Sequence, residues 1–90
     1  MKNKRNILDI AAEILQIALN CAKKTHVMYR VNLNSKVIHE YLDTMEEAEL
    51  ITYNEREIKA TEEGIEYLKS YESFTKYMES SLSSLIQFEN

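Results

Sequence analysis

The sequence predicts a mainly α-helical fold of the α+β class, with one short β-hairpin and a long C-terminal helix. Three observations predict it. The 90 residues include no proline and one glycine, so few residues would interrupt a helix. Two short segments with helical apolar spacing flank a break at residues 32–34. From residue 62 to residue 87, apolar residues recur three and four positions apart without a helix breaker.

The first predicted helix covers residues 5–20 and has more apolar surface than one core face needs. Its core-facing stripe is Ile7, Ala11, Ile14, Leu15 and Ala18. The additional apolar residues are Leu8, Ile10 and Ile17. They predict a second contact, either with the last helix or with a partner subunit.

Residues 25–51 predict two helices joined by a tight turn. Thr25 is expected to cap the first of them. Asn32 is expected to end it in the left-handed conformation, and Asn34 or Ser35 to cap the second. The predicted buried stripe of the second helix is Ile38, Tyr41, Leu42 and Met45. Two helices joined this closely form a helix-turn-helix, whose second helix can enter the major groove of DNA.

A short hairpin is predicted next, with strands at 50–53 and 58–60 and a turn at 54–57. Thr61 is expected to cap the last helix, and Glu62 and Glu63 suit its first turn, because the helix dipole favours acidic groups there. The expected division is therefore a helix-turn-helix unit with hairpin at residues 1–60 and a C-terminal helix at 61–90.

The last helix is too long for the body that it would cover. A helix over residues 62–87 extends about 39 Å, whereas a body of about 60 residues measures about 25 Å across. The apolar surface of the overhang needs a partner, and a second copy of the chain is the simplest one. The alternative is a monomer whose helix folds back or frays near the serines at 80–84. The expected dimer interface is Leu68, Tyr71, Phe74, Met78, Leu82 and Leu85.

Charge is divided unevenly along the chain, although the total is −4. Residues 1–41 hold seven Lys or Arg and three acids, a local charge of +4. Residues 42–90 hold four Lys or Arg and twelve acids, a local charge of −8. Phosphates respond to the local field, so the basic half is expected to face a nucleic acid.

Nine residues are candidates for contact with double-stranded DNA, through phosphates or base edges. They are Lys23, Lys24, Thr25, Arg30, Asn34, Ser35, Lys36, His39 and Arg56. Glu40 and Asp43 lie on the same face of the second helix and would repel phosphate. We therefore expect modest affinity per subunit, which a dimer would raise by linking two sites.

Other classes of function have little support in the sequence. No phosphate-binding loop, nucleophile elbow or metalloprotease motif occurs, so no catalytic residue is expected. Cys21, His26 and His39 are spaced unlike any zinc site, so neither a metal nor another cofactor is expected. A single cysteine fits a reducing compartment, and no apolar run is long enough to span a membrane. The expected localisation is cytoplasmic, associated with the nucleoid.

The stretch AKKTHVMYRVNLNSKVIHEYLDTMEEAELI resembles a family of archaeal winged-helix regulators that share the pattern AKKTHIMYxxNLsxxxlxxYLdxLxexgLI. The likeness covers residues 7–68 and continues through T-x-x-G-x-x-x-L, here Thr61, Gly64 and Leu68. Ala48–Glu49 departs from it where the pattern usually has glycine. The resemblance implies a DNA-binding winged helix, often with a short strand before the helix-turn-helix. In some members the C-terminal helix forms an antiparallel coiled-coil dimer.

Two functions follow from these observations. The first is sequence-specific or architectural binding of double-stranded DNA by a homodimer, as a transcriptional regulator. The second is a winged-helix module that binds a protein and not DNA. The net acidity, the small hairpin, and Glu40 and Asp43 on the exposed face of the second helix favour it.

Overall fold

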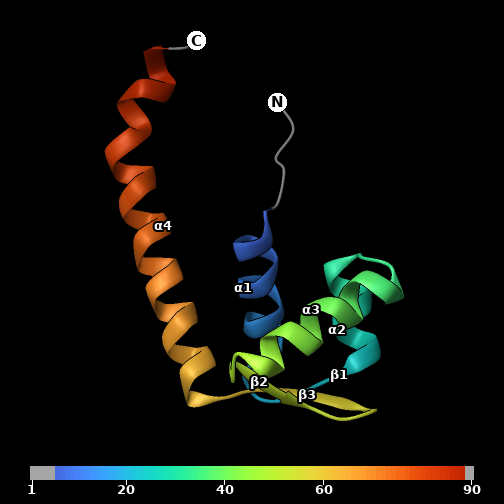
Figure 1. Ribbon diagram of the computed structural model, residues 1–90. Helices are drawn as coiled ribbons and strands as arrows, with labels where there is room; N and C mark the ends of the chain where they lie inside the picture. Colours follow the sequence, from blue (N-terminus) through green and yellow to red (C-terminus); the bar gives the residue numbers. More distant parts are fainter. Residues whose placement is uncertain (1–5, 89–90) are drawn as a thin grey trace.

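The computed structural model describes residues 6–88, and the side chains of residues 6–82 (Figure 1). Its elements are α1 (Ile7–Ile17), β1 (Ala22–Lys23), α2 (Lys24–Val31), α3 (Ser35–Glu47), β2 (Ile51–Tyr53), β3 (Glu57–Ala60) and α4 (Glu62–Phe88). The predicted mainly helical fold with a short hairpin and a long last helix is confirmed.

The three strands form one antiparallel sheet in the order β1-β3-β2. Ile58 of β3 pairs with Ala22 on one side and with Tyr53 on the other. The predicted hairpin is confirmed, with Glu57 in the strand and not in the turn. The short strand before α2, which the resemblance implied, is also present.

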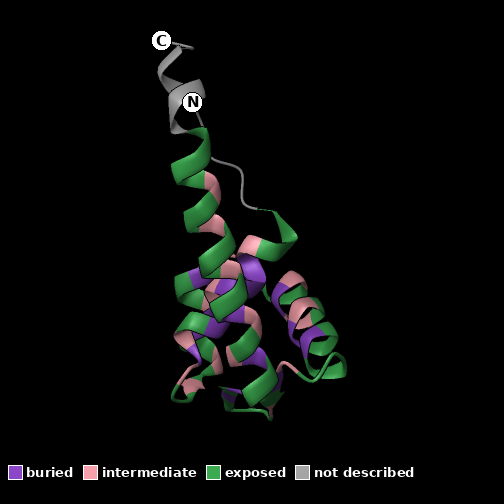
Figure 2. Ribbon diagram, turned by 90° about the vertical axis from the view of Figure 1, so that its left-hand side faces the viewer, coloured by how far each residue is buried: buried purple, intermediate pink, exposed green. Residues whose placement is uncertain are grey.

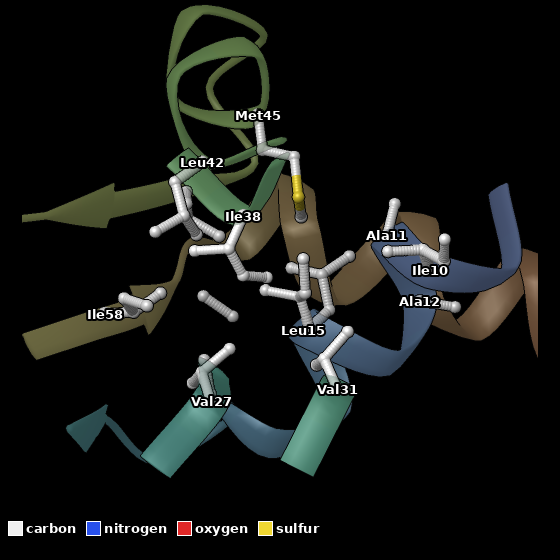
Figure 3. Close-up of a cluster of buried hydrophobic side chains, with 14 of the residues drawn as sticks. Ile10, Ala11, Ala12, Leu15, Val27, Val31, Ile38, Leu42, Met45 and Ile58 are labelled. Carbon is white, nitrogen blue, oxygen red and sulfur yellow. The ribbon is translucent and has the colours of Figure 1, made fainter. Parts of the chain in front are cut away.

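The core lies where α1, α2, α3 and the sheet meet, and α4 closes it from the side (Figure 3). Ile14, Leu15, Val27, Val31, Ile38, Leu42 and Ile58 are fully enclosed. The predicted stripe of α3 is confirmed, with Tyr41 half-buried at its edge.

The ends of α1 differ from the sequence prediction. The helix begins after Asn6, whose side chain accepts the Asp9 backbone N–H while the Asp9 carboxylate accepts the Asn6 N–H. Ile7 was expected in the core and is 69% exposed, while Ile10 is buried. α1 begins at Ile7, and its first turn projects beyond α2 and α3 (Figure 1).

The turn of the helix-turn-helix follows the prediction at Asn32 and Asn34. Asn32 is left-handed, with φ 62° and ψ 49°, and Asn34 Oδ1 accepts the Val37 N–H at 2.9 Å. The prediction that Thr25 caps α2 is wrong, because the helix begins at Lys24 without a side-chain cap. The Lys24 N–H instead donates to the Arg56 carbonyl at 2.7 Å, so the hairpin takes the place of the cap.

The corner between α3 and β2 requires a left-handed residue, and Glu49 supplies it with φ 68°. This is the region where the resemblance has glycine. A residue with a β-carbon is disfavoured there by roughly 1 kcal/mol relative to glycine. The corner keeps its shape because the Thr61 hydroxyl donates to the Glu49 carbonyl at 2.6 Å.

Glu49→Gly should therefore stabilise the protein by about 1 kcal/mol. Chemical denaturation at fixed protein concentration measures the change. Ala48→Gly is the matched control: Ala48 has φ −80° and ψ 0°, so glycine there gains nothing from relieved strain and only adds backbone freedom in the unfolded chain. Equal effects of the two substitutions would contradict the argument.

α4 is joined to the rest of the chain near its start. The Thr61 Oγ1 caps it by accepting the Gly64 N–H at 3.0 Å, as predicted. Leu68 is 5% exposed and packs in the chain's own core. The first turns of α4 are therefore part of the folded body that begins with α1.

Two tyrosines of α4 bind α1. The Tyr67 hydroxyl donates to the Leu8 carbonyl at 3.2 Å, and the Tyr71 hydroxyl donates to the Asp9 carboxylate. The hydrogen bond from Tyr71 lowers the pKa of Asp9, and the same bond raises the pKa of Tyr71.

The Asp9 pKa gives a pH prediction. Because its folded pKa is lowered, Asp9 contributes stability above its ordinary pKa of 3.8 and loses that contribution as pH falls through the folded value. The wild type should thus lose more stability than Asp9→Asn on acidification below 3.8. Denaturation midpoints of both proteins between pH 5 and pH 2 test this, and parallel curves would contradict it.

Beyond Tyr71, α4 continues past the end of α1 as a long arm (Figures 1 and 2). The described part of the chain measures 48 × 27 × 19 Å. On this arm Phe74 is 63%, Tyr77 66% and Leu82 38% exposed. Within the part of the chain that the structure covers, no helix is both long and apolar enough to cross a membrane.

Candidate nucleic-acid interface

Four of the predicted DNA-binding residues meet where α2 begins beside the tip of the β2–β3 hairpin. Lys23, Lys24, Thr25 and Arg56 line one hollow of about 320 Å³, together with Glu55 and Glu57. The hydrogen bond from the Lys24 N–H to the Arg56 carbonyl joins the start of α2 to the hairpin tip. We call this the basic hollow. The N-terminal amides of α2 and its dipole add to the attraction that three cations exert on an anion there.

The hairpin tip is held in one shape by Asn54. Its side-chain oxygen accepts the backbone N–H groups of Arg56 and Glu57 at 2.8 and 2.9 Å. The Asn54 N–H donates to the Glu57 carbonyl at 3.0 Å, which closes the turn. Arg56 is therefore presented from a rigid tip and its side chain is exposed.

Tyr53 connects the hairpin to both helices. Its ring lies under the Lys24 ammonium, with Nζ 5.2 Å from the ring centroid. Its hydroxyl donates to the Asp43 carboxylate of α3, and this bond raises the pKa of Tyr53 to about 12. Asp43 was expected to repel phosphate, but the structure shows that one of its oxygens accepts this hydrogen bond.

The first two turns of α3 carry the remaining predicted contacts. Asn34, Ser35 and Lys36 are exposed, and His39 is half-buried. The His39 Nδ1–H donates to the Ser35 carbonyl at 2.8 Å, which holds the ring against the helix. Glu40 lies among them and is exposed, and Asp43 follows it on the same face of α3.

Arg30 lies apart from the other candidates. It lines a hollow with Asp9, Glu13 and Glu72, between α1 and α4. Three of the residues that line this hollow with it are acidic. We therefore leave Arg30 out of the interface proposed below.

The predicted dimer residues are also in different surroundings. Leu68 is in the core and the Tyr71 hydroxyl is bound to Asp9, whereas Phe74 and Leu82 are exposed and Met78 is half-buried. The side chain of Leu85 lies outside the described residues.

Sequence reasoning missed two residues of the site, Tyr53 and Asn54. Tyr53 has no local signal, because its role depends on Lys24 and Asp43, which are distant in sequence. Asn54 does have one, since asparagine at the first position of a turn readily accepts the following backbone N–H groups. Among the described residues, no three His, Cys, Asp or Glu side chains lie close enough to hold a metal ion.

Comparison with known proteins finds a matching family and a similar solved structure. The family model described as "Winged helix-turn-helix" matches residues 4–79. Among solved structures, Sso10a-2, a DNA-binding protein from Sulfolobus solfataricus, is similar, with a TM-score of 0.78 and 27% sequence identity over 94% of each chain. A comparison with curated proteins gives no significant match.

Proposed function

This chain belongs to the winged helix-turn-helix family, and on that premise we propose that it binds double-stranded DNA as a homodimer. The proposal places α3 in the major groove, since the second helix of such motifs enters there with its N-terminal residues. Asn34, Ser35 and Lys36 would contact base edges or phosphates from that end of α3.

The observation that carries the proposal is the basic hollow. Lys23, Lys24 and Arg56 come from separate elements and are joined through the bond between Lys24 and the Arg56 carbonyl. Three cations next to the recognition helix suit the backbone beside a groove, because phosphate contacts position a protein on the duplex. The similarity to a protein described as DNA-binding supports the same conclusion.

Dimerisation is supported by the exposed apolar residues of the arm. Phe74, Tyr77 and Leu82 lie beyond the body with large exposed fractions, and a second copy of the arm would cover them. The interface proposed from the structure is therefore nearer the C-terminus than the sequence indicated, since Leu68 and Tyr71 are engaged within the chain. The two DNA-binding sites of the dimer would then bind together. The dimer would act as a transcriptional regulator or as an architectural protein of the nucleoid.

Salt dependence and mass test the proposal together. Light scattering should give twice the mass of one chain. Affinity for duplex DNA in gel shifts should fall with salt, with a logarithmic slope near 0.9 for each phosphate contact. A chain of single mass that binds no duplex at low salt would overturn the proposal.

The alternative is a module that binds a protein through the same face. Glu40 on α3 and the two acids of the basic hollow, Glu55 and Glu57, favour it because they weaken the attraction for phosphate. If the protein binds no random duplex at any salt concentration, this alternative is favoured. Duplex binding whose affinity falls steeply with salt would exclude it.

A further inference from the structure

One carboxylate on α1 and two tyrosines on α4 join the arm to the body. We call Asp9, Tyr67 and Tyr71 the brace, and residues 72–88 the arm. The Asp9 carboxylate accepts both the Tyr71 hydroxyl and the Asn6 N–H that begins α1. The rings of Tyr67 and Tyr71 are stacked, with centroids 6.4 Å apart and planes 19° from parallel. The brace therefore locks one side of α4 to the first turn of α1.

A second attachment holds the start of α4. Thr61 binds the Glu49 carbonyl, the Thr61 N–H binds the Leu50 carbonyl, and Gly64 packs against that same carbonyl. Thr61 and Tyr71 are ten residues apart, about 15 Å along a helix. Leu68 lies between these two points and packs in the core, so the first turns of α4 keep their place. The hydroxyl bonds of the brace narrow the range of angles that the rest of the helix samples, and their loss would widen it.

We infer that the brace sets the angle between arm and body, and thereby the distance between the two recognition helices of the dimer. Asp9 and Tyr71 are, on this view, positioning residues that determine which spacing of two DNA half-sites the protein accepts. The inference rests on the homodimeric DNA binding proposed above.

Because the arm is long, a small change in its angle to the body moves its tip by a large distance. The arm from Tyr71 to Phe88 is about 25 Å long at 1.5 Å per residue. A tilt of roughly 10° moves its tip by about 4 Å, which exceeds one base-pair step of about 3.4 Å. Half-sites of a dimer lie about one helical turn apart. A pivot of this size in each subunit is enough to change the preferred spacing.

The distance between the two bodies can be measured without DNA. A spin label at Glu47→Cys, in a Cys21→Ser background, reports the separation of the two α3 helices of the dimer. Pulsed electron paramagnetic resonance measures this distance. Both positions are exposed. The labelled protein should give one narrow distance distribution, and Tyr67→Phe with Tyr71→Phe should broaden it. Tyr29→Phe is the matched control, because it removes a hydroxyl from a residue that is 82% exposed on α2.

DNA selectivity gives the second readout. Duplexes recovered from a random-sequence pool by the wild type are remade with the spacer lengthened or shortened by one or two base pairs. The wild type should prefer its own spacing by about tenfold, since linked sites act together only when their span matches. The double variant should lose most of this preference while its unfolding midpoint and its affinity for one half-site change little.

Each outcome decides the matter. A double variant with a narrow distribution and an unchanged spacing preference overturns the brace and leaves the proposed function standing. A wild type that accepts all spacings equally does the same. A wild type that is monomeric or binds no duplex overturns both. A broad distribution with lost spacing preference in the double variant, and neither in Tyr29→Phe, establishes the brace.

Discussion

Gly64→Ala should destabilise the protein by about 3 kcal/mol, the upper range for overpacking a core. Gly64 is buried, and a β-carbon there would overlap the Leu50 carbonyl oxygen and lie 2.9 Å from Leu15 Cδ2. Backbone oxygen cannot move aside as a side-chain end does. α4 would have to shift away from β2, and this would also loosen the bond from the Thr61 N–H to Leu50.

Chemical denaturation at one protein concentration measures the loss, because the proposed dimerisation would make stability depend on concentration. Ser70→Ala is the control, an alanine substitution at an exposed position of the same helix. It should be neutral or stabilising by a few tenths of a kcal/mol, since alanine favours helix. A Gly64→Ala protein as stable as Ser70→Ala would show that α4 does not lie as close to the Leu50 carbonyl as the structure has it.

Reversing two charges of the basic hollow should nearly abolish DNA binding. Lys24→Glu with Arg56→Glu removes two cations of the proposed interface and adds two acids beside Glu55 and Glu57. We expect affinity to fall by about 100-fold at about 0.1 M salt, and the salt slope to fall by about 0.9 for each phosphate that the variant no longer neutralises. Gel-shift titrations at several salt concentrations measure both quantities.

The matched control makes the same change of net charge on α4. Lys69→Glu with Lys76→Glu alters two exposed residues of α4, a helix that does not line the basic hollow. This pair should lower affinity only slightly, through the long-range field. Equal losses in the two pairs would mean that total charge, and not the hollow, governs binding. Light scattering and circular dichroism confirm that both variants remain folded and dimeric.

Local patterns predicted most of the fold because each signal depends on nearby residues. Asn32, Asn34 and Thr61 act within three or four positions of their partners. Asn32 and Thr61 were correctly assigned, and Asn34 is one of the two residues that were expected to cap α3. The buried stripe of α3 also follows from the helical repeat alone. These features need no knowledge of the rest of the chain.

The failures all depend on contacts between distant segments. Thr25 was given a capping role that the Arg56 carbonyl performs from the hairpin. Ile7 fits the helical stripe, but the stripe cannot tell where the neighbouring helices end. Leu68 and Tyr71 have the spacing of a dimer seam, and periodicity does not distinguish a partner's surface from the chain's own core.

The sequence predicted which basic residues could form the candidate site, but it did not predict how they group in space. The charge asymmetry indicated the basic half, but it included Arg30, which lies among Asp9, Glu13 and Glu72. The role of Tyr53, under Lys24 and bound to Asp43, depends on three elements brought together by folding.

The bond between Lys24 and Arg56 ties the length of the hairpin to the start of α2. An insertion at the tip would displace the Arg56 carbonyl and leave the first amide of α2 without an acceptor. A longer tip thus requires a second, compensating change, such as serine or aspartate in place of Lys23 at the N-cap. The length of the hairpin tip and the residue at position 23 are therefore constrained to change together. An engineered longer loop without the second change would destabilise the start of α2.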